Sequence, residues 1–290
     1  MGIIDDSLVF ERAPLGVDAP ELATIESWAA ASPDRQRSIA DAVVEELRSR
    51  IQTECAVELA SFGGPPIAII TCGAQSLCLV PGGSFEMGFS EEEEAAVRAR
   101  AEENDGRTNQ YELYWSLLEN PHLLRPLTTV HIAPLLAARG PGEMYEIDTA
   151  CDVLASSKLR LPSEAEWEYL ARGGKRRALT YVGDYVPDDP SDYLHITALA
   201  AEGANAFGLW GFGIGPELCA DVYSPTHDGA ALDGSPRRGP GPRVTRGGAG
   251  QLFMWQDTGE WQLLLNAMRG SSATWKYEIA LRFVLGIQCA

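Results

Sequence analysis

The residues best suited to chemistry in this chain are its histidines, because a neutral imidazole binds metal ions and carries protons. They are His122, His131, His195 and His227. No two have the His-x-x-x-His spacing that places two imidazoles on one face of a helix. His195 and His227 are the better metal-ligand candidates, since they lie in a loop-rich region with several aspartates. These aspartates are Asp192, Asp221 and Asp228. Taken singly, each histidine is more typical of a surface or hydrogen-bonded residue than of a ligand.

The cysteines predict neither a zinc site nor a disulfide framework. They are Cys55, Cys72, Cys78, Cys151, Cys219 and Cys289. Only Cys72 and Cys78 are close in sequence, and no second pair with matching spacing accompanies them. We therefore expect most of the six to be buried thiols that pack as small apolar side chains.

A second set of candidates lies in residues 251–275, which mix large rings with amide and guanidinium groups. The predicted binding residues are Phe253, Trp255, Trp261, Asn266, Arg269 and Trp275. Such a mixture is typical of interface anchors. For any one tryptophan, burial in the core is the slightly favoured alternative. Burial of the whole set is not.

The charge of the chain bears on its partners. The 290 residues carry a net charge of −18 at pH 7, which repels phosphate backbones, so no nucleic-acid partner is expected. No stretch approaches the roughly 20 apolar residues of a membrane span, and the first residues do not resemble a signal peptide. We therefore expect an acidic cytoplasmic protein with no membrane partner. Lys and Arg gather at residues 172–177 and 237–246, where a solvated surface is favoured over an anion site.

Local signals predict the elements that position these groups. Ser163 and Glu166 form a capping box at the start of a helix, and Gly173 ends that helix in a left-handed conformation. Ser32-Pro33 begins a second helix, in which apolar residues recur at helical spacing to about residue 53. Strands are expected at residues 67–72, 76–80 and 128–132, and a loop at 228–242. Ser90 and Glu93 open an acidic helix to about residue 103, expected to be solvated.

Residues 159–174 read Leu-Arg-Leu-Pro-Ser-Glu-Ala-Glu-Trp-Glu-Tyr-Leu-Ala-Arg-Gly-Gly. This string resembles the Arg-Leu-Pro-Thr-Glu-Ala-Glu-Trp-Glu-Tyr-Ala-Ala-Arg-Gly signature of the formylglycine-generating enzyme (sulfatase-modifying factor) family. Further similar segments follow in the family's order at residues 79–88, 205–210, 217–223, 243–248 and 281–283. The resemblance implies an α+β, C-type-lectin-like fold of small twisted sheets, helices and ordered loops.

The domain organisation follows from where this resemblance begins. We assign residues 76–290 to the lectin-like domain and residues 1–75 to an N-terminal elaboration of helices and strands clamped onto it. The alternative for residues 1–75 is a small separate dimerisation domain.

The resemblance also implies metal chemistry that this chain does not retain. Oxidising members of the family bind copper through two cysteines, and soft thiolates select Cu(I). Here Leu252 and Asp257 occupy those positions, and residues 246–288 contain no cysteine. A neighbouring branch holds nonhaem iron with three histidines, but this chain lacks the helical histidine pair. We therefore expect neither metal.

Calcium is the remaining cofactor that the resemblance implies, and it is the minority alternative. Ile214 stands where the family has an asparagine that supplies an oxygen. Glu217 and nearby carbonyls offer few of the six to eight oxygens that calcium takes. Glu217 and Asp221 are instead expected to be buried carboxylates that hold loop amides. The arginines expected to bind buried carboxylates or carbonyls are Arg160, Arg246 and Arg282.

A retained scaffold with lost chemistry favours a non-catalytic binding protein, a pseudoenzyme. Its C-terminal loops would bind a protein or a small-molecule ligand. The variable protein of a diversity-generating retroelement is a relative within this hypothesis. One alternative is a metal-dependent oxidoreductase or maturation enzyme with a site rebuilt from His195, His227, Asp221 or Glu217. Another is a regulatory subunit docked through its N-terminal helices.

Overall fold

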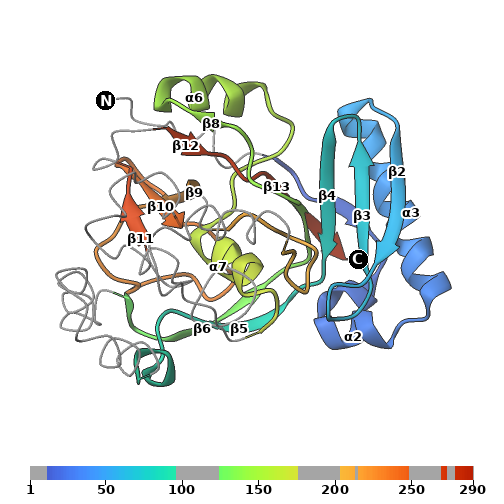
Figure 1. The fold of residues 1–290 in the computed structure, drawn as a ribbon, viewed down its shortest axis with the longest axis horizontal. Coiled ribbons are helices and arrows are strands. Elements are labelled where there is room, and N and C mark those ends of the chain that lie inside the picture. The colour runs from blue at the N-terminus through green and yellow to red at the C-terminus, as the bar shows by residue number, and fades with distance from the viewer. Residues whose placement is uncertain are drawn as a thin grey trace.

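The computed structural model describes residues 12–95, 124–175, 203–212, 215–247, 269–272 and 278–289. Helices and sheets are mixed in an α+β arrangement, as expected (Figure 1). Hydrogen bonding organises the strands into a six-stranded, a five-stranded and a two-stranded sheet. No helix in these ranges is long and apolar enough to cross a membrane.

The six-stranded sheet combines strands from both ends of the chain. In spatial order it contains β1 (Leu15–Val17), β13 (Val284–Cys289), β7 (Leu135–Ala138), β4 (Gln75–Val80), β3 (Ile67–Cys72) and β2 (Cys55–Ala60). Its central strands are buried on both faces, so they read as nearly continuous apolar runs. Along β3, Ala68 and Ile70 face one apolar cluster, whereas Ile67 and Ile69 face another.

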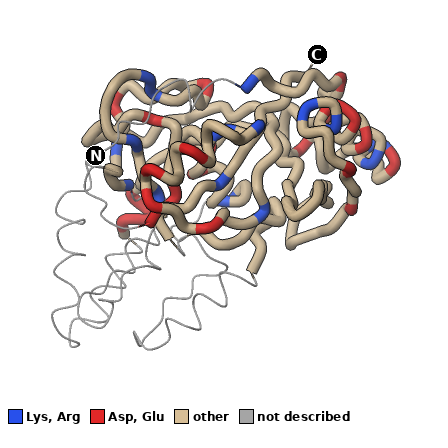
Figure 2. The backbone as a smooth tube through the Cα atoms, turned by 90° about the horizontal axis from the view of Figure 1, so that it is seen from above, with Lys and Arg blue, Asp and Glu red and all other residues tan. Residues whose placement is uncertain are grey.

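The helix α3 (Pro33–Ile51) covers the first of these faces (Figure 1). Ser32 caps it by accepting from the amide of Arg35, and Pro33 occupies its first turn, as predicted. Its apolar stripe packs against the sheet, while residues of both charges follow its length (Figure 2). The short helices η1 (Pro20–Ala23) and α2 (Ile25–Ala30) precede it.

This sheet bears on the predicted boundary between residues 75 and 76. That boundary falls within the first residues of β4, just after the turn of the β3–β4 hairpin, where Gly73 has a left-handed φ of 61°. In addition, β1 pairs in parallel with β13 at the opposite end of the sequence. The two assigned parts therefore share one sheet.

The other two sheets lie on the far side of the molecule from α3 (Figure 1). The five-stranded sheet contains, in spatial order, β11 (Arg269–Ser271), β10 (Arg243–Gly247), β9 (Pro216–Val222), β12 (Ile279–Ala280) and β8 (Met144–Tyr145). The two-stranded sheet pairs β5 (Gly83–Met87) with β6 (Thr128–Ile132). The helix α6 (Ile147–Ser156) follows β8 and packs its buried residues Ala150 and Leu154 against Leu218 of β9.

The helix α7 (Glu164–Arg172) lies at the centre of the fold (Figure 1). It contacts β5, β6, β9 and β10, so it joins the two smaller sheets. Its predicted ends are confirmed: Ser163 and Glu166 form a reciprocal capping box, and Gly173 is left-handed with φ 59°. The apolar cluster on its face of the six-stranded sheet includes Trp167, Leu170 and Val284.

Replacing Ser163 by alanine should lower the free energy of unfolding by about 1 kcal/mol, because the amide of Glu166 loses its side-chain acceptor. That hydrogen bond is 3.0 Å long. Urea denaturation of the variant measures the loss. Ser49→Ala is the matched control, since the Ser49 hydroxyl is exposed on α3. Equal denaturation midpoints for the two variants would show that the Ser163 cap contributes nothing.

One cysteine expectation is wrong. Cys55 on β2 and Cys72 on β3 are directly opposite each other in the antiparallel register and form a disulfide. The sequence separation of 17 residues runs along β2, a connecting loop and β3, so spacing alone did not signal the disulfide. Disulfides are rare in the reducing cytosol. This pair therefore weighs against the cytoplasmic expectation.

Candidate functional site

The predicted binding residues fall mainly within one connection, whose two ends the structure describes. Strands β10 and β11 are antiparallel neighbours, with Val244 opposite Ser271 and Arg246 opposite Arg269. Residues 248–268 connect these strands, so the two described ends of the connection lie side by side. Four predicted binding residues in this connection lie outside the described residues, as does Trp275. The four are Phe253, Trp255, Trp261 and Asn266.

We call the paired ends of β10 and β11, at Arg246 and Arg269, the β10–β11 base. Arg269, the sixth predicted binding residue, lies at this base, and its exposed fraction is only 9%. Its Nη2 is 2.5 Å from Oε2 of Glu164, the first residue of α7. Its guanidinium carbon also stands 5.5 Å from the ring centroid of Tyr223. In the described structure Arg269 is therefore a buried residue that links β11 to the start of α7.

A second arginine, Arg246 on β10, also forms buried ion pairs with α7. The Arg246 guanidinium pairs with Glu168 on α7, and its Nη1 lies 3.5 Å from Oε1 of Glu164. Arg246 also stacks over the Trp167 ring, 5.3 Å from its centroid. Both strands that border residues 248–268 are thus tied to α7 by buried ion pairs. The expectation that Arg246 binds a buried carboxylate is confirmed.

The ion-pair network continues through Glu168 to the start of the helix after Ser90. Arg172 contacts Glu168 at 2.8 Å and Glu93 at 2.7 Å. Burial alone would raise the pKa of Glu168, but Arg172 and Arg246 outweigh it and hold this pKa below its ordinary value.

Expectations about solvated charges are confirmed only in part at this network. The Ser90–Glu93 capping box forms as predicted. Glu91 and Glu92 are exposed, as expected of a solvated helix, but Glu93 is 6% exposed and pairs with Arg172. Arg172, Arg243 and Arg246 are likewise buried, although their clusters were assigned to the surface. Arg172 pairs with Glu93 and Arg246 with Glu168, and Arg243 donates to the carbonyl of Ala220, so burial of these charges is compensated. The sequence around each arginine did not reveal these partners.

Glu217 on β9 forms a second buried pair, with Arg282. The two side chains make a bidentate contact with N–O distances of 2.7 and 2.9 Å, and the indole of Trp167 donates to Glu217 at 3.0 Å. Glu217 was expected to hold loop amides, but it contacts these side chains instead. Arg282 also donates to the carbonyls of Ala138 and Trp210. This pair therefore ties β7, β9 and the loop at Trp210 together.

Asp221 does hold backbone amides, as predicted. Its carboxylate accepts from the amide of Glu164 at 2.6 Å and from that of Arg237 at 2.8 Å. Burial and the nearby Glu164 raise the pKa of Asp221 to about 7, although the two amides act in the opposite direction. Asp221 thus fastens the 228–242 loop to the start of α7.

Of the two favoured histidine candidates, the structure describes only His227. His227 is 2% exposed, and among the described residues neither of its ring nitrogens has a hydrogen-bond partner. Burial lowers the pKa of His227 to about 4, with Glu164 and Glu168 opposing that shift and Arg269 and Arg246 adding to it. His227 therefore belongs to the same charged cluster as the β10–β11 base. His195 lies outside the described residues.

The remaining metal and nucleophile candidates do not assemble into a reactive group in the described ranges. These ranges contain no cluster of three His, Cys, Asp or Glu side chains that could hold a metal ion. His131 is exposed and contacts Ser84 at 3.3 Å. Cys78 and Cys219 are buried free thiols, as expected, and burial raises the pKa of Cys78 to about 12. Leu252 and Asp257 lie outside the described residues.

Comparisons with known proteins give a distant likeness. No family model matches the sequence, and no curated protein matches it. The structure of PvdO from Pseudomonas aeruginosa is similar over 73% of this chain and 95% of its own, at 18% identity and a TM-score of 0.47. Treponema denticola variable protein 1 is similar over 80% of this chain and 99% of its own, at 11% identity and a TM-score of 0.43. At these scores the likeness carries no functional argument.

Proposed function

We propose that this chain is a non-catalytic binding protein with the C-type-lectin-like fold of the formylglycine-generating enzyme family. Its binding surface is the connection between β10 and β11, residues 248–268, together with Trp275. The observation that supports this proposal is the base of that connection. Arg246 and Arg269 border it on paired strands, and both contact Glu164 at the start of α7.

A fixed base suits binding because ordering a loop costs conformational entropy, and that cost falls when the ends of the loop are already held in place. Recognition residues are commonly carried on loops that a rigid scaffold positions. The ion pairs at this base are buried, so salt screens them less than surface pairs. The scaffold can therefore keep its geometry while the connecting sequence varies.

The buried carboxylates in the described residues are better suited to stabilising the fold than to catalysis. Glu164, Glu168 and Glu217 are each paired with an arginine inside the protein. Carboxylates engaged in this way serve poorly as proton carriers for an outside substrate. At the copper positions of the family, Leu252 and Asp257 supply no thiolate. Calcium remains the minority cofactor alternative, and the partner is proposed to be a protein or a small molecule.

Replacing Trp255 or Trp261 by alanine should abolish partner capture while leaving stability nearly unchanged, because a hot-spot ring typically contributes 2 kcal/mol or more to binding. The measurement is quantitative mass spectrometry of proteins and metabolites retained by the immobilised chain, combined with melting temperatures. Arg37→Ala is the matched control, since Arg37 is 51% exposed on α3.

The opposite result has a distinct signature. Core tryptophans would lose roughly 3 to 5 kcal/mol of stability on truncation. Such a loss, with an unchanged set of captured molecules, would contradict the proposed surface and leave the N-terminal helices as the next candidate.

A further inference from the structure

The loop at residues 224–230, which follows β9, is anchored in the interior by a single buried side chain. His227 is 2% exposed, whereas the other residues of this loop are half-buried or exposed. The amide of His227 donates to the carbonyl of Arg125 at 3.2 Å, and the amide of Ala230 donates back to the carbonyl of His227 at 3.0 Å. The imidazole is therefore the buried anchor of a surface loop.

Charged groups from three elements face the His227 ring. They are Glu164 and Glu168 on α7, Arg246 on β10 and Arg269 on β11. On another side the ring meets backbone, since a Cβ at Gly88 would lie 3.6 Å from Nδ1 of His227. The guanidinium of Arg125 pairs with Glu94 at 2.7 Å, and Asp228 is exposed. The ring therefore lies between two carboxylates and two guanidinium groups.

These four charges already compensate one another. Arg246 pairs with Glu168, and Arg269 pairs with Glu164 at 2.5 Å. A proton on His227 would therefore add a buried charge that the groups around it do not compensate. Burial accordingly lowers the pKa of His227 to about 4. In a loop that has moved into water, the same ring would titrate near its ordinary pKa of 6.5.

Several buried polar atoms of this cluster have no hydrogen-bond partner among the described residues. They are both ring nitrogens of His227, Oε1 of Glu164, and Nε and Nη1 of Arg269. Each such atom raises the free energy of the closed arrangement, because it has lost contact with water without a replacement. Movement of the loop away from the cluster would let water reach these atoms, so it lowers the cost of opening.

We propose that residues 224–230 form an acid-released latch, which His227 holds closed while its ring is neutral. In the open state the loop leaves the charged cluster and the protonated ring lies in water. Asp221 on β9 stays in place, because it accepts from the amides of Glu164 and Arg237, which lie outside the loop. Its titration is therefore the same in both states. The latch does not depend on the binding surface proposed at residues 248–268.

The latch should open over a defined range of pH. The closed state has the lower pKa, so its advantage from His227 is complete above pH 6.5 and is lost as pH falls toward 4. With these two pKa values the open state is about 20-fold more populated, relative to the closed state, at pH 5 than at pH 7.

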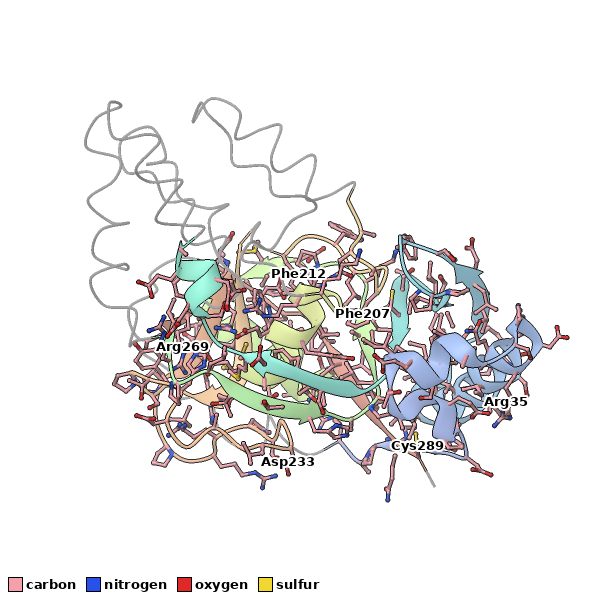
Figure 3. All side chains as sticks on the ribbon, turned by 90° about the horizontal axis from the view of Figure 1, so that it is seen from below. Arg35, Phe207, Phe212, Asp233, Arg269 and Cys289 are labelled. Carbon is pink, nitrogen blue, oxygen red and sulfur yellow. A yellow bond between two sulfur atoms is a disulfide. The ribbon has the colours of Figure 1, made fainter. Side chains whose placement is uncertain are left out.

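Amide hydrogen exchange, followed by NMR on the full chain, measures this opening. Exchange at residue 227 requires its hydrogen bond to the Arg125 carbonyl to break. Its protection factor, corrected for intrinsic exchange at each pH, should fall about 20-fold from pH 7 to pH 5. Amides of α3 report more extensive unfolding, because Arg35 on α3 lies at the opposite end of the molecule from Arg269 (Figure 3). Residue 227 should be less protected than these amides at both pH values.

Two variants test the imidazole itself. His227→Leu and His227→Met keep an apolar anchor that cannot be protonated, so each should abolish the fall in protection at residue 227. Should one of them fail to fold, the other variant and the profile of the parent still decide. His131→Leu is the matched control, because His131 is exposed on β6, and it should retain the fall seen in the parent.

Three results would overturn the proposal. The first is protection at residue 227 that does not fall between pH 7 and pH 5 in the parent. The second is protection at residue 227 equal to that of the α3 amides, which would mean that the loop opens only when the chain unfolds. The third is an equal fall in His227→Leu or His227→Met, which would place the acid sensitivity in another group.

Discussion

Replacing Arg282 by methionine is expected to destabilise the protein by about 3 to 5 kcal/mol, because it leaves Glu217 as an uncompensated buried charge. Both side chains are fully buried, and Arg282 forms the ion pair with Glu217 at 2.7 Å. The loss also frees the carbonyls of Ala138 and Trp210 from their donor. Urea denaturation of the variant measures the change in the free energy of unfolding.

A double variant separates the lost pair from lost packing. Arg282→Met combined with Glu217→Gln removes both charges, so it should recover part of the stability. Arg37→Met is the surface control, and it should change stability by less than about 1 kcal/mol because Arg37 and Asp41 form an exposed pair. If Arg282→Met were no less stable than this control, the buried pair would not be holding the sheets together.

Elements with local signals were predictable from sequence. The capping residues of α7 and α3 and the strands expected at residues 67–72, 76–80 and 128–132 all appear where the pattern placed them. Each of these signals depends on residues within one or two turns of the chain. The α+β class was instead implied by the resemblance to the formylglycine-generating enzyme family.

Long-range pairings were not predictable in this way. The parallel contact of β1 with β13 joins opposite ends of the chain. The disulfide of Cys55 with Cys72 depends on the register of β2 against β3, which neither cysteine specifies. A strand register is set by turn geometry and by which face is buried. The number of cysteines and their spacing therefore do not predict the register.

The same distinction applies to the candidate site. Aromatic content drew attention to residues 251–275, and the likeness of residues 243–248 to a family segment predicted that Arg246 would bind a buried carboxylate. The sequence did not show that Arg269 lies opposite Arg246 or that both contact Glu164. Arg269 was assigned to a binding surface because it belongs to a stretch that mixes large rings, amides and guanidinium groups, as interface anchors do. Its acidic partner stands over a hundred residues away in sequence.

Acid should destabilise the protein through His227. An unfolded histidine titrates near its ordinary pKa of 6.5, whereas burial lowers the folded pKa of His227 to about 4. The unfolded state therefore binds the proton first as pH falls. The stability from this residue is complete above pH 6.5 and is lost between pH 6.5 and pH 4, amounting to roughly 3 kcal/mol.

Asp221 opposes this trend, so a variant is needed to isolate it. The folded pKa of Asp221 is raised to about 7, and its contribution is present below the unfolded value of 3.8 and lost as pH rises to 7. The difference between the parent and His227→Leu removes Asp221 from the comparison. Since neither ring nitrogen of His227 has a hydrogen-bond partner among the described residues, leucine should change stability at pH 7 by less than about 1.5 kcal/mol.

The decisive measurement is the free energy of unfolding of parent and variant between pH 4 and pH 7. His227→Leu should gain on the parent as pH falls, by roughly 3 kcal/mol at pH 4 relative to pH 7. His131→Leu is the control, because His131 is exposed on β6 and its loss should leave the acid sensitivity of the parent in place. A constant difference between parent and His227→Leu across this range would mean that the His227 ring finds a proton acceptor in the folded protein. The cluster beneath β10 and β11 would then hold a hydrogen-bonded histidine, and the rigid base would extend to the loop at residues 224–230.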